Sequence, residues 1–397
     1  MGRLTYLDHA ATTPLDERVL EAMLPFLRER WGNPSSLYSH GRVARRALDE
    51  SRDTVAQVLG ARPSEILFTS GGTESDNLAL KGVAFARRAD GDHIVTTRVE
   101  HHAALRTCEW LERRGGFQVT YVGVDRHGVV DLDELERAVR PGTILVSVMM
   151  ANNEVGTIQP VAEAAAIAHR HGATFHTDAI QAAGSLELDP NTLGVDLLSL
   201  SGHKIYGPKG VGVLYVRRGT PLLPDAHGGG QERGLRAGTE NVAGIVGMAE
   251  ALRLAEVERP ARNEHDAGLR DRLISGILGS VDGARLTGHP TRRLPNSASF
   301  VFEDTDGESI LMDLDQYDIC ASSGSACTSG TLEVSHVLTA LGLSDQLARG
   351  SVRLTTGRAT SDEDVERLLA VMPDVVARVR SIMPMLLGTR EQASVDR

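Results

Sequence analysis

Residues 65–88 read E-I-L-F-T-S-G-G-T-E-S-D-N-L-A-L-K-G-V-A-F-A-R-R. The first five, Glu65–Thr69, are mostly apolar or β-branched and predict a strand. Gly71 and Gly72 interrupt this run, and the residues that follow them predict a helix over Glu74–Arg88. A strand that leads through a glycine turn into a helix is the building unit of α/β folds, so this stretch sets the fold class.

Short β-rich runs alternate with helical patterns from residue 60 to about residue 217. This order predicts βαβ units, and therefore an α/β fold whose large domain has a mainly parallel, seven-stranded sheet flanked by helices. The last run, V-G-V-L-Y-V, follows its predecessor without an intervening helix, which allows an antiparallel orientation. The expected strands are Glu65–Thr69, His93–Thr97, Gln118–Val122, Thr143–Met150, Thr174–Thr177, Val195–Ser199 and Val211–Val216, and the expected helices between them are Glu74–Arg88, Ala103–Arg113, Leu132–Val139 and Pro160–His171.

The remainder of the chain has a different pattern, which predicts a smaller α+β domain. Two long helices are expected, over Thr239–Val257 and Asn263–Leu278. We therefore expect a large domain over residues 15–259 and a small domain made of residues 1–14 and 260–397. The other expected elements are helices at Asp16–Arg28, Glu308–Asp315 and Asp362–Met383, and strands at Ser297–Glu303 and Ser351–Thr355.

Composition excludes several classes of function. The chain has 397 residues, a net charge of −11 and 41% hydrophobic residues. The negative charge argues against general binding of nucleic acids and against docking on anionic membranes. No apolar run approaches the roughly 20 residues of a membrane span, and the first residues lack the apolar core of a signal peptide. Three separated cysteines form neither a disulfide framework nor a zinc motif, so we expect a cytoplasmic, reduced protein without a metal site.

Lysine is scarce in this sequence. Only Lys81, Lys204 and Lys209 occur, so 39 of the 42 basic residues are arginine. A lysine amine can form a Schiff base, whereas the guanidinium of arginine stays protonated and cannot. Lys204 lies in the loop S-G-H-K-I-Y-G-P-K-G, where its alternative interpretation is a solvated surface cation.

Polar residues follow five of the predicted strands. In open α/β sheets, ligands bind at the carboxyl ends of the strands, so these residues predict a binding site along one edge of the sheet. Stability alone does not explain five polar clusters at such an edge. The clusters are Gly71-Gly72-Thr73, His101-His102, Asn152-Asn153-Glu154, Asp178 with Gln181, and Ser201-Gly202-His203-Lys204.

Three of these clusters together predict one cofactor. Gly72 and Thr73 at the start of a helix suit a phosphate, although Thr73 alone also reads as an ordinary helix cap. Asp178 suits a pyridine nitrogen, although alone it too reads as a helix cap. Lys204 suits an aldehyde. A phosphate cradle, a carboxylate and a lysine on successive strand ends are typical of a pyridoxal-phosphate site.

Cys327 lies in the stretch G-S-A-C-T-S-G, residues 324–330, whose small polar residues cannot build a core. A structural cysteine is usually buried among apolar neighbours. Cys327 therefore does not have the surroundings of a core residue, and we expect its loop to be mobile. Cys108 and Cys320 lie in helix-like and strand-like runs and are expected to serve as core residues.

Ten motifs, spread over nearly the whole chain, occur in the order that is typical of one known family. The motifs are Y-L-D-H-A-A-T-T-P (6–14), N-P-S-S (33–36), S-G-G-T-E-S-D-N (70–77), V-E-H-H-A (99–103), N-N-E-V-G-T-I-Q-P (152–160), H-T-D-A-I-Q (176–181), S-G-H-K-I-Y-G-P-K-G (201–210), G-G-G-Q-E-R-G-L-R-A-G-T-E-N (228–241), S-G-S-A-C-T-S (323–329) and V-R-L-T-T-G-R (352–358). In them the chain resembles the cysteine desulfurases, in the class V aminotransferase branch of the fold type I pyridoxal-phosphate enzymes. The likeness is strongest to the housekeeping enzymes that feed iron–sulfur assembly.

The resemblance implies a role for each matching residue. Lys204 would be the Schiff-base lysine, Asp178 the partner of the ring nitrogen and Cys327 the nucleophile. It also implies a homodimer, because Thr239 would reach the cofactor phosphate of the neighbouring subunit. The remaining implied roles are ring stacking and proton transfer for His101, contact with the ring hydroxyl for Gln181, phosphate binding for Gly72, Thr73, Ser201 and His203, and binding of the substrate carboxylate for Asn153 and Arg353. Asn153 is also expected to contact the cofactor.

The resemblance further implies the reaction. L-cysteine would be converted to L-alanine, and its sulfur would be left as a persulfide on Cys327. The expected acceptors are iron–sulfur scaffold proteins and tRNA-thiolation proteins. The alternatives are a selenocysteine lyase or another class V aminotransferase-like enzyme, and, from a different class, a sulfur-carrying scaffold or regulatory subunit with a vestigial site.

Overall fold

The computed structural model describes residues 3–324 and 334–395. Its large sheet has seven strands in the order β2-β8-β7-β6-β5-β3-β4. Only β8 runs against its neighbours, so the sheet is mainly parallel, as predicted, with the last strand antiparallel. The strands are β2 (Ile66–Thr69), β3 (His93–Thr97), β4 (Gln118–Val122), β5 (Thr143–Ser147), β6 (Thr174–Asp178), β7 (Leu197–Ser201) and β8 (Gly212–Val216).

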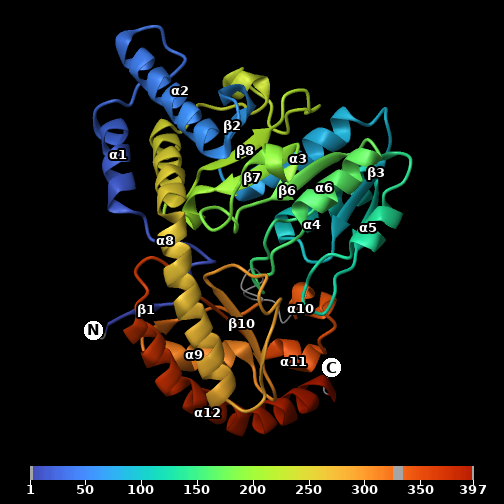
Figure 1. The fold of residues 1–397 in the computed structure, drawn as a ribbon, viewed down its shortest axis with the longest axis vertical. Coiled ribbons are helices and arrows are strands. Elements are labelled where there is room, and N and C mark those ends of the chain that lie inside the picture. The colour runs from blue at the N-terminus through green and yellow to red at the C-terminus, as the bar shows by residue number, and fades with distance from the viewer. Residues whose placement is uncertain (1–2, 325–333, 396–397) are drawn as a thin grey trace.

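Alternating apolar side chains bury both faces of this sheet. Leu67 and Leu197 face one cluster of buried residues, whereas the next residues along the same strands, Phe68 and Leu198, face another. This period of two is the geometry of a strand covered on both sides. The helices around the sheet (Figure 1) are α2 (Ser39–Leu59), α3 (Gly72–Ala86), α4 (His102–Gly115), α5 (Leu132–Ala138), α6 (Val161–Arg170) and α7 (Pro190–Leu193).

One helix, α8 (Val242–Ser280), replaces the two helices predicted for this region. The prediction of two helices was wrong: the helix continues through Pro260, although proline removes one hydrogen bond and clashes with the preceding turn. Contacts on both sides of Pro260 outweigh that penalty: α8 packs on α2 and α1 (Glu17–Arg28) and also on α12 (Asp362–Val395). Figure 1 shows α8 running from the large sheet into the smaller part.

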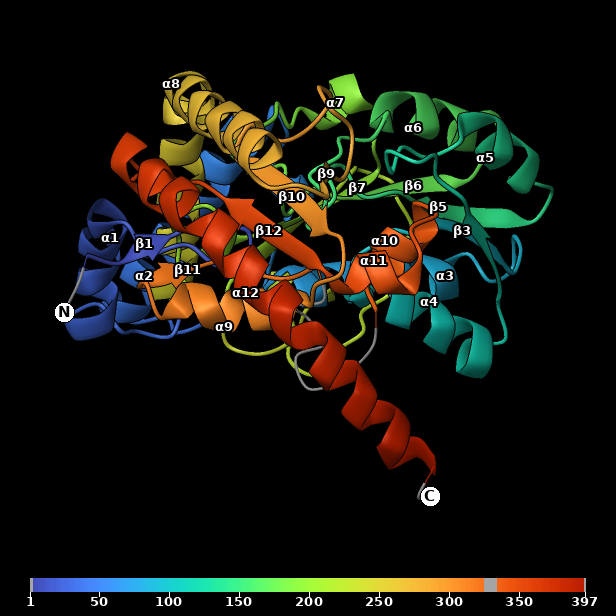
Figure 2. The ribbon, with the colours of Figure 1, turned by 90° about the horizontal axis from the view of Figure 1, so that it is seen from below.

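The smaller part has its own hydrophobic core beside a three-stranded antiparallel sheet. Its long helix α12 crosses the outside of this sheet (Figure 2), and its N-terminal strand β1 (Thr5–Tyr6) pairs with β11 (Ile319–Cys320). Within the described residues, none of the helices is both long and apolar enough to cross a membrane. The other elements are α9 (Gly307–Asp315), α10 (His336–Ala340), α11 (Asp345–Arg349), β9 (Ala284–Leu286), β10 (Ser297–Phe302) and β12 (Ser351–Thr355).

Candidate cofactor and active site

Ten of the predicted site residues line a single cavity of about 380 Å³. They come from strand ends and loops that are far apart in sequence, and the parallel strands bring them to one edge of the sheet. Four further lining residues were not predicted: Ala10, Ala11, Met149 and Ile180. The ten predicted residues are Gly72, Thr73, His101, Asn153, Asp178, Gln181, Ser201, His203, Lys204 and Arg353.

The glycine turn brings the start of α3 to this cavity. Gly71, with a φ of +154°, is the N-cap of the helix, so the alternative in which Thr73 caps the helix is wrong. Gly72 and Thr73 lie in the first turn, whose N–H groups lack partners within the helix and favour an anion. A Cβ at Gly72 would overlap Cδ1 of Ile180, so only glycine fits there without displacement of its neighbour.

Gly72→Ala should therefore weaken both cofactor binding and folding. The added methyl pushes Ile180 toward the cavity that both residues line. We expect affinity for pyridoxal phosphate to fall about tenfold, and the free energy of unfolding to fall by about 1–3 kcal/mol. Absorbance titration and thermal melting measure the two effects. Gly268→Ala is the control, since its Cβ would meet no atom within 4 Å; equal affinity of Gly72→Ala and wild type would contradict the prediction.

Asp178, at the end of β6, is a buried carboxylate at the floor of the cavity. Its Oδ1 accepts a hydrogen bond from the N–H of Ile180, at 2.9 Å. Burial raises the pKa of Asp178 to about 6, while this N–H and the charge of Lys204 oppose the rise. A positively charged ring nitrogen beside Asp178 would also oppose this rise in the pKa of the carboxyl. The ionised carboxylate would in turn stabilise that positive charge.

Lys204 follows β7 in a short 3₁₀ turn, Gly202–Lys204. Its Nζ donates hydrogen bonds to the carbonyl oxygens of Ala10, at 2.5 Å, and Ala11, at 2.7 Å. The side chain of Gln181 also donates to the carbonyl of Ala10. The N-terminal segment thus positions the lysine, a role that sequence reasoning missed although the motif containing it had been recognised.

The two histidines of the cavity are neutral at neutral pH. His101 is the N-cap of α4, and its Nδ1 accepts from the N–H of Ala103, at 3.1 Å. Burial and the charge of Lys204 lower the pKa of His101 to about 4, and they do the same to His203. A neutral imidazole can stack on a ring and can accept a proton.

Arg353 is buried on β12 and points into the same cavity. It donates to the carboxylate of Asp8, at 2.8 Å, and to the backbone carbonyl of Asn153, at 2.8 Å. Its Nε is buried without a hydrogen-bond partner among the described residues. The site therefore has an unsatisfied cationic donor, and Asp8 is a second residue that sequence reasoning missed.

Two predicted residues do not join this group. Thr239 is exposed and does not line the cavity. Cys327 and the expected mobility of its loop lie outside the described residues. Cys108 is buried, as predicted, and Cys320 is half-buried; burial raises the pKa of both thiols, which disfavours the reactive thiolate.

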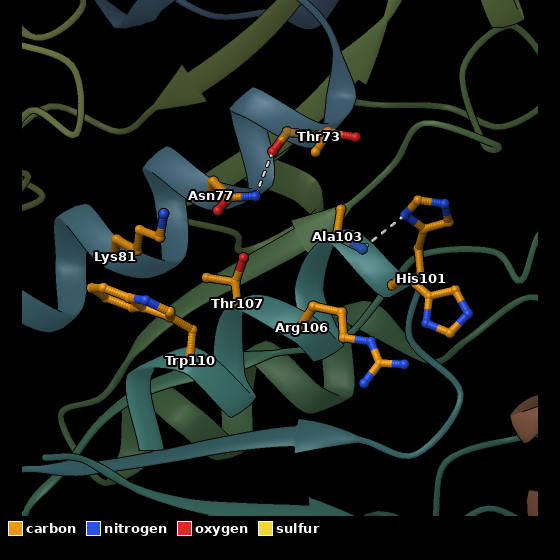
Figure 3. Close-up of a pocket in the computed structure, with 9 residues that line it drawn as sticks. Thr73, Asn77, Lys81, His101, Ala103, Arg106, Thr107 and Trp110 are labelled. Carbon is orange, nitrogen blue, oxygen red and sulfur yellow. Dashed lines mark hydrogen bonds between the residues drawn. The ribbon is translucent and has the colours of Figure 1, made fainter. Parts of the chain in front are cut away.

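A second hollow, of about 680 Å³, adjoins the cavity, because Thr73 and His101 line both. Figure 3 shows that α3 and α4 form its walls. Lys81 lies over the ring of Trp110, with Nζ 5.1 Å from the ring centroid. The wall of the hollow therefore carries a lysine and a tryptophan, next to the start of α3 that is predicted to bind the phosphate.

Comparison with known proteins identifies the family. The Aminotransferase class-V family matches residues 5–368, and the chain therefore belongs to that family. Cysteine desulfurase IscS of Methanosarcina thermophila is 51% identical over 97% of this chain and 95% of its own length. The IscS of Dictyoglomus turgidum is 50% identical over 97% of both chains. Within the class-V family, the chain thus groups with the cysteine desulfurases.

Solved structures agree with this assignment. A NifS-like protein matches with a TM-score of 0.89 and 41% identity, over 94% of this chain and 100% of the other. A structure described as SspA in complex with cysteine matches with a TM-score of 0.78 and 37% identity, over 89% of this chain and 99% of the other. The fold class and the family predicted from sequence are confirmed.

Proposed function

We propose that this protein is a pyridoxal-phosphate-dependent cysteine desulfurase that converts L-cysteine to L-alanine and holds the released sulfur as a persulfide on Cys327. The observation that carries the proposal is the convergence of Gly72, Asp178 and Lys204 on one cavity, in a chain about 50% identical to desulfurases. The side chain of Arg353 lines the same cavity, and a guanidinium suits the carboxylate of an amino acid.

The residues present fit the cofactor. The start of α3, with Gly72 and Thr73, would hold the phosphate together with Ser201 and His203. Asp178 would pair with the ring nitrogen, whose positive charge would oppose the effect of burial on the pKa of this carboxyl. The other roles in the proposal are contact with the ring hydroxyl for Gln181, stacking for His101, contact with the phosphate in the neighbouring subunit for Thr239, and substrate binding for Asn153.

The bound cofactor would act as an electron sink that weakens the C–S bond of cysteine. Lys204 moves a proton at the substrate Cα, and Arg353 with Asn153 orients the substrate carboxylate. The Cys327 thiolate attacks the substrate sulfur: an S–S bond forms, the C–S bond breaks, and its electron pair stays with the carbon that becomes the methyl group of alanine. We include in the proposal a homodimer, a cytoplasmic location, and transfer of sulfur to iron–sulfur scaffold and tRNA-thiolation proteins.

Mass spectrometry of peptides after brief treatment of the loaded enzyme with L-cysteine tests this function. We expect one added sulfur on the Cys327 peptide, removable by a reducing thiol, together with free alanine. The peptides that carry Cys108 and Cys320 are internal controls and should stay unmodified. Formation of a keto acid without alanine would instead indicate transamination and would refute the proposed reaction.

A further inference from the structure

Three carboxyl groups are buried together beneath the cavity. Asp76 comes from α3, Glu100 from the turn between β3 and α4, and Asp178 from the end of β6. Asp76 and Glu100 have no solvent exposure, and Asp178 is 4% exposed. The three carboxyl groups also affect one another electrostatically. Burial raises the pKa of both Asp76 and Glu100, and the negative charge of Asp178 raises them further. Buried carboxyl groups whose charges act on one another cannot all be ionised without a large penalty.

Few hydrogen-bond donors surround Glu100 and Asp76 that could stabilise a negative charge on either carboxyl group. Oε1 of Glu100 accepts from the hydroxyl of Thr97, at 2.7 Å, and from the N–H of Met149, at 2.9 Å. Oε2 of Glu100 and both carboxyl oxygens of Asp76 lack hydrogen bonds within the described part of the chain. A buried carboxylate with unsatisfied oxygens is strongly disfavoured, whereas a neutral acid is tolerated.

The titratable neighbours do not supply a balancing cation to this pair. Nε2 of His176 lies 3.6 Å from Oδ1 of Asp76, but burial lowers the pKa of His176 to about 3, so it is neutral. Cys108 on α4 is a buried thiol whose pKa is raised by burial and by Glu100. The charge of Lys204 acts on Asp178, the carboxyl that lines the cavity.

Burial determines which carboxyl keeps its proton. It raises the pKa of Glu100 to about 8, and it raises the pKa of Asp76 well above the ordinary value, which the nearby Ser199 hydroxyl only partly opposes. Asp178 differs from both, because its carboxyl accepts the N–H of Ile180 and the charge of Lys204 opposes the rise of its pKa. Of the three carboxyl groups, Asp178 is therefore the one best able to hold a negative charge.

We propose that Asp76 and Glu100 are positioning residues: a pair of acids kept neutral behind Asp178, so that the single negative charge of the cluster faces the cofactor ring. The pair acts through Asp178 and touches neither cofactor nor substrate. This inference rests on the proposed function, because it assigns the ring nitrogen to Asp178. It also limits the alkaline range of the site, since loss of a proton from Glu100 places a second negative charge behind Asp178.

Amide substitutions test the neutrality of the pair by thermal melting. Asn and Gln resemble neutral acids in shape but cannot ionise. Because the folded-state pKa of each acid is raised, the stability it contributes is lost as pH rises from its unfolded value, near 4, through its folded value. The melting temperature of Glu100→Gln and Asp76→Asn should therefore increase relative to wild type between about pH 5 and pH 8, and the gain should level off above about pH 8 for Glu100→Gln.

Absorbance of the bound cofactor tests the positioning role. In wild type, the second charge that appears above about pH 8 holds the proton of the bound cofactor more tightly. The Glu100→Gln, Asp76→Asn double variant lacks this second charge. The alkaline change of its visible band should therefore be complete at a pH ~0.5–1 unit lower than in wild type. Asp266→Asn is the control: this buried carboxyl, bonded to Thr356, also has a raised pKa, so its removal alters melting but leaves the titration unchanged.

Melting differences that do not vary with pH would overturn the neutrality of the pair, and identical absorbance titrations in wild type and double variant would overturn its action on Asp178. If the wild-type protein bound no pyridoxal phosphate, the proposed function would fail. The melting profiles of the cofactor-free protein would then still decide whether Asp76 and Glu100 are neutral.

Discussion

Lys204→Ala abolishes the visible absorbance of the pyridoxal-phosphate-loaded enzyme and lowers alanine formation from L-cysteine by at least about 10³-fold. Alanine at this position removes both the amine that binds the aldehyde and the group that moves the proton at Cα. Proton transfer by a positioned side chain alone contributes about 10²–10⁴-fold, so the combined loss should reach or exceed this range. Absorbance spectra and quantified alanine measure the two effects.

Lys209→Ala is the matched control for this change. Lys209 lies in the same glycine-rich loop, but it is exposed and does not line the cavity. Its substitution should leave the spectrum and the rate close to those of wild type. The assignment of Lys204 would be refuted by a Lys204→Ala protein in which borohydride still fixed the cofactor covalently and which turned over cysteine normally.

Cys327→Ser keeps the cofactor absorbance and loses sulfide release in the presence of a reducing thiol. A serine hydroxyl is nearly isosteric with a thiol, but it does not ionise near neutral pH and cannot form a persulfide. We expect the cofactor site to stay unchanged, because the substitution leaves Gly72, Asp178 and Lys204 in place. We expect the rate of sulfide release to fall by at least about 10²-fold, because the substitution removes the nucleophile that accepts the sulfur.

Cys320→Ser provides the comparison for Cys327→Ser. Cys320 is half-buried in β11, and the raised pKa of its thiol disfavours the thiolate. Its substitution should leave sulfide release within about twofold of wild type, with at most a small loss of stability. Sulfide release from Cys327→Ser at the wild-type rate would show that another group accepts the sulfur.

Residue type and local pattern were enough to predict most of the cofactor site. Gly72, Asp178 and Lys204 each follow a strand that could be read from apolar and β-branched runs, and parallel strands of one sheet present their ends at one edge. Chemistry restricted the remaining choice, because a Schiff base needs a lysine and this chain has only three. For this reason the predicted residues converge on one cavity, although Gly72 and Lys204 are 132 positions apart in sequence.

Other features needed tertiary structure because they depend on segments that no local pattern joins. Asp8 bonds to Arg353 across 345 positions of sequence, and the carbonyl of Ala10 receives Lys204 across 194. The unbroken α8 is decided by contacts on both sides of Pro260, which outweigh its local helix-breaking tendency.

By itself, the sequence determined the fold class, the family and the candidate residues for the chemistry, because strand and helix periods and the demands of the cofactor are local properties. The proposed charge states, by contrast, depend on the tertiary structure. Asp76, Glu100 and Asp178 are all acidic residues in the sequence, and a carboxyl group ionises according to its burial and its neighbours. Those neighbours are set by how α3, the β3–α4 turn and β6 meet.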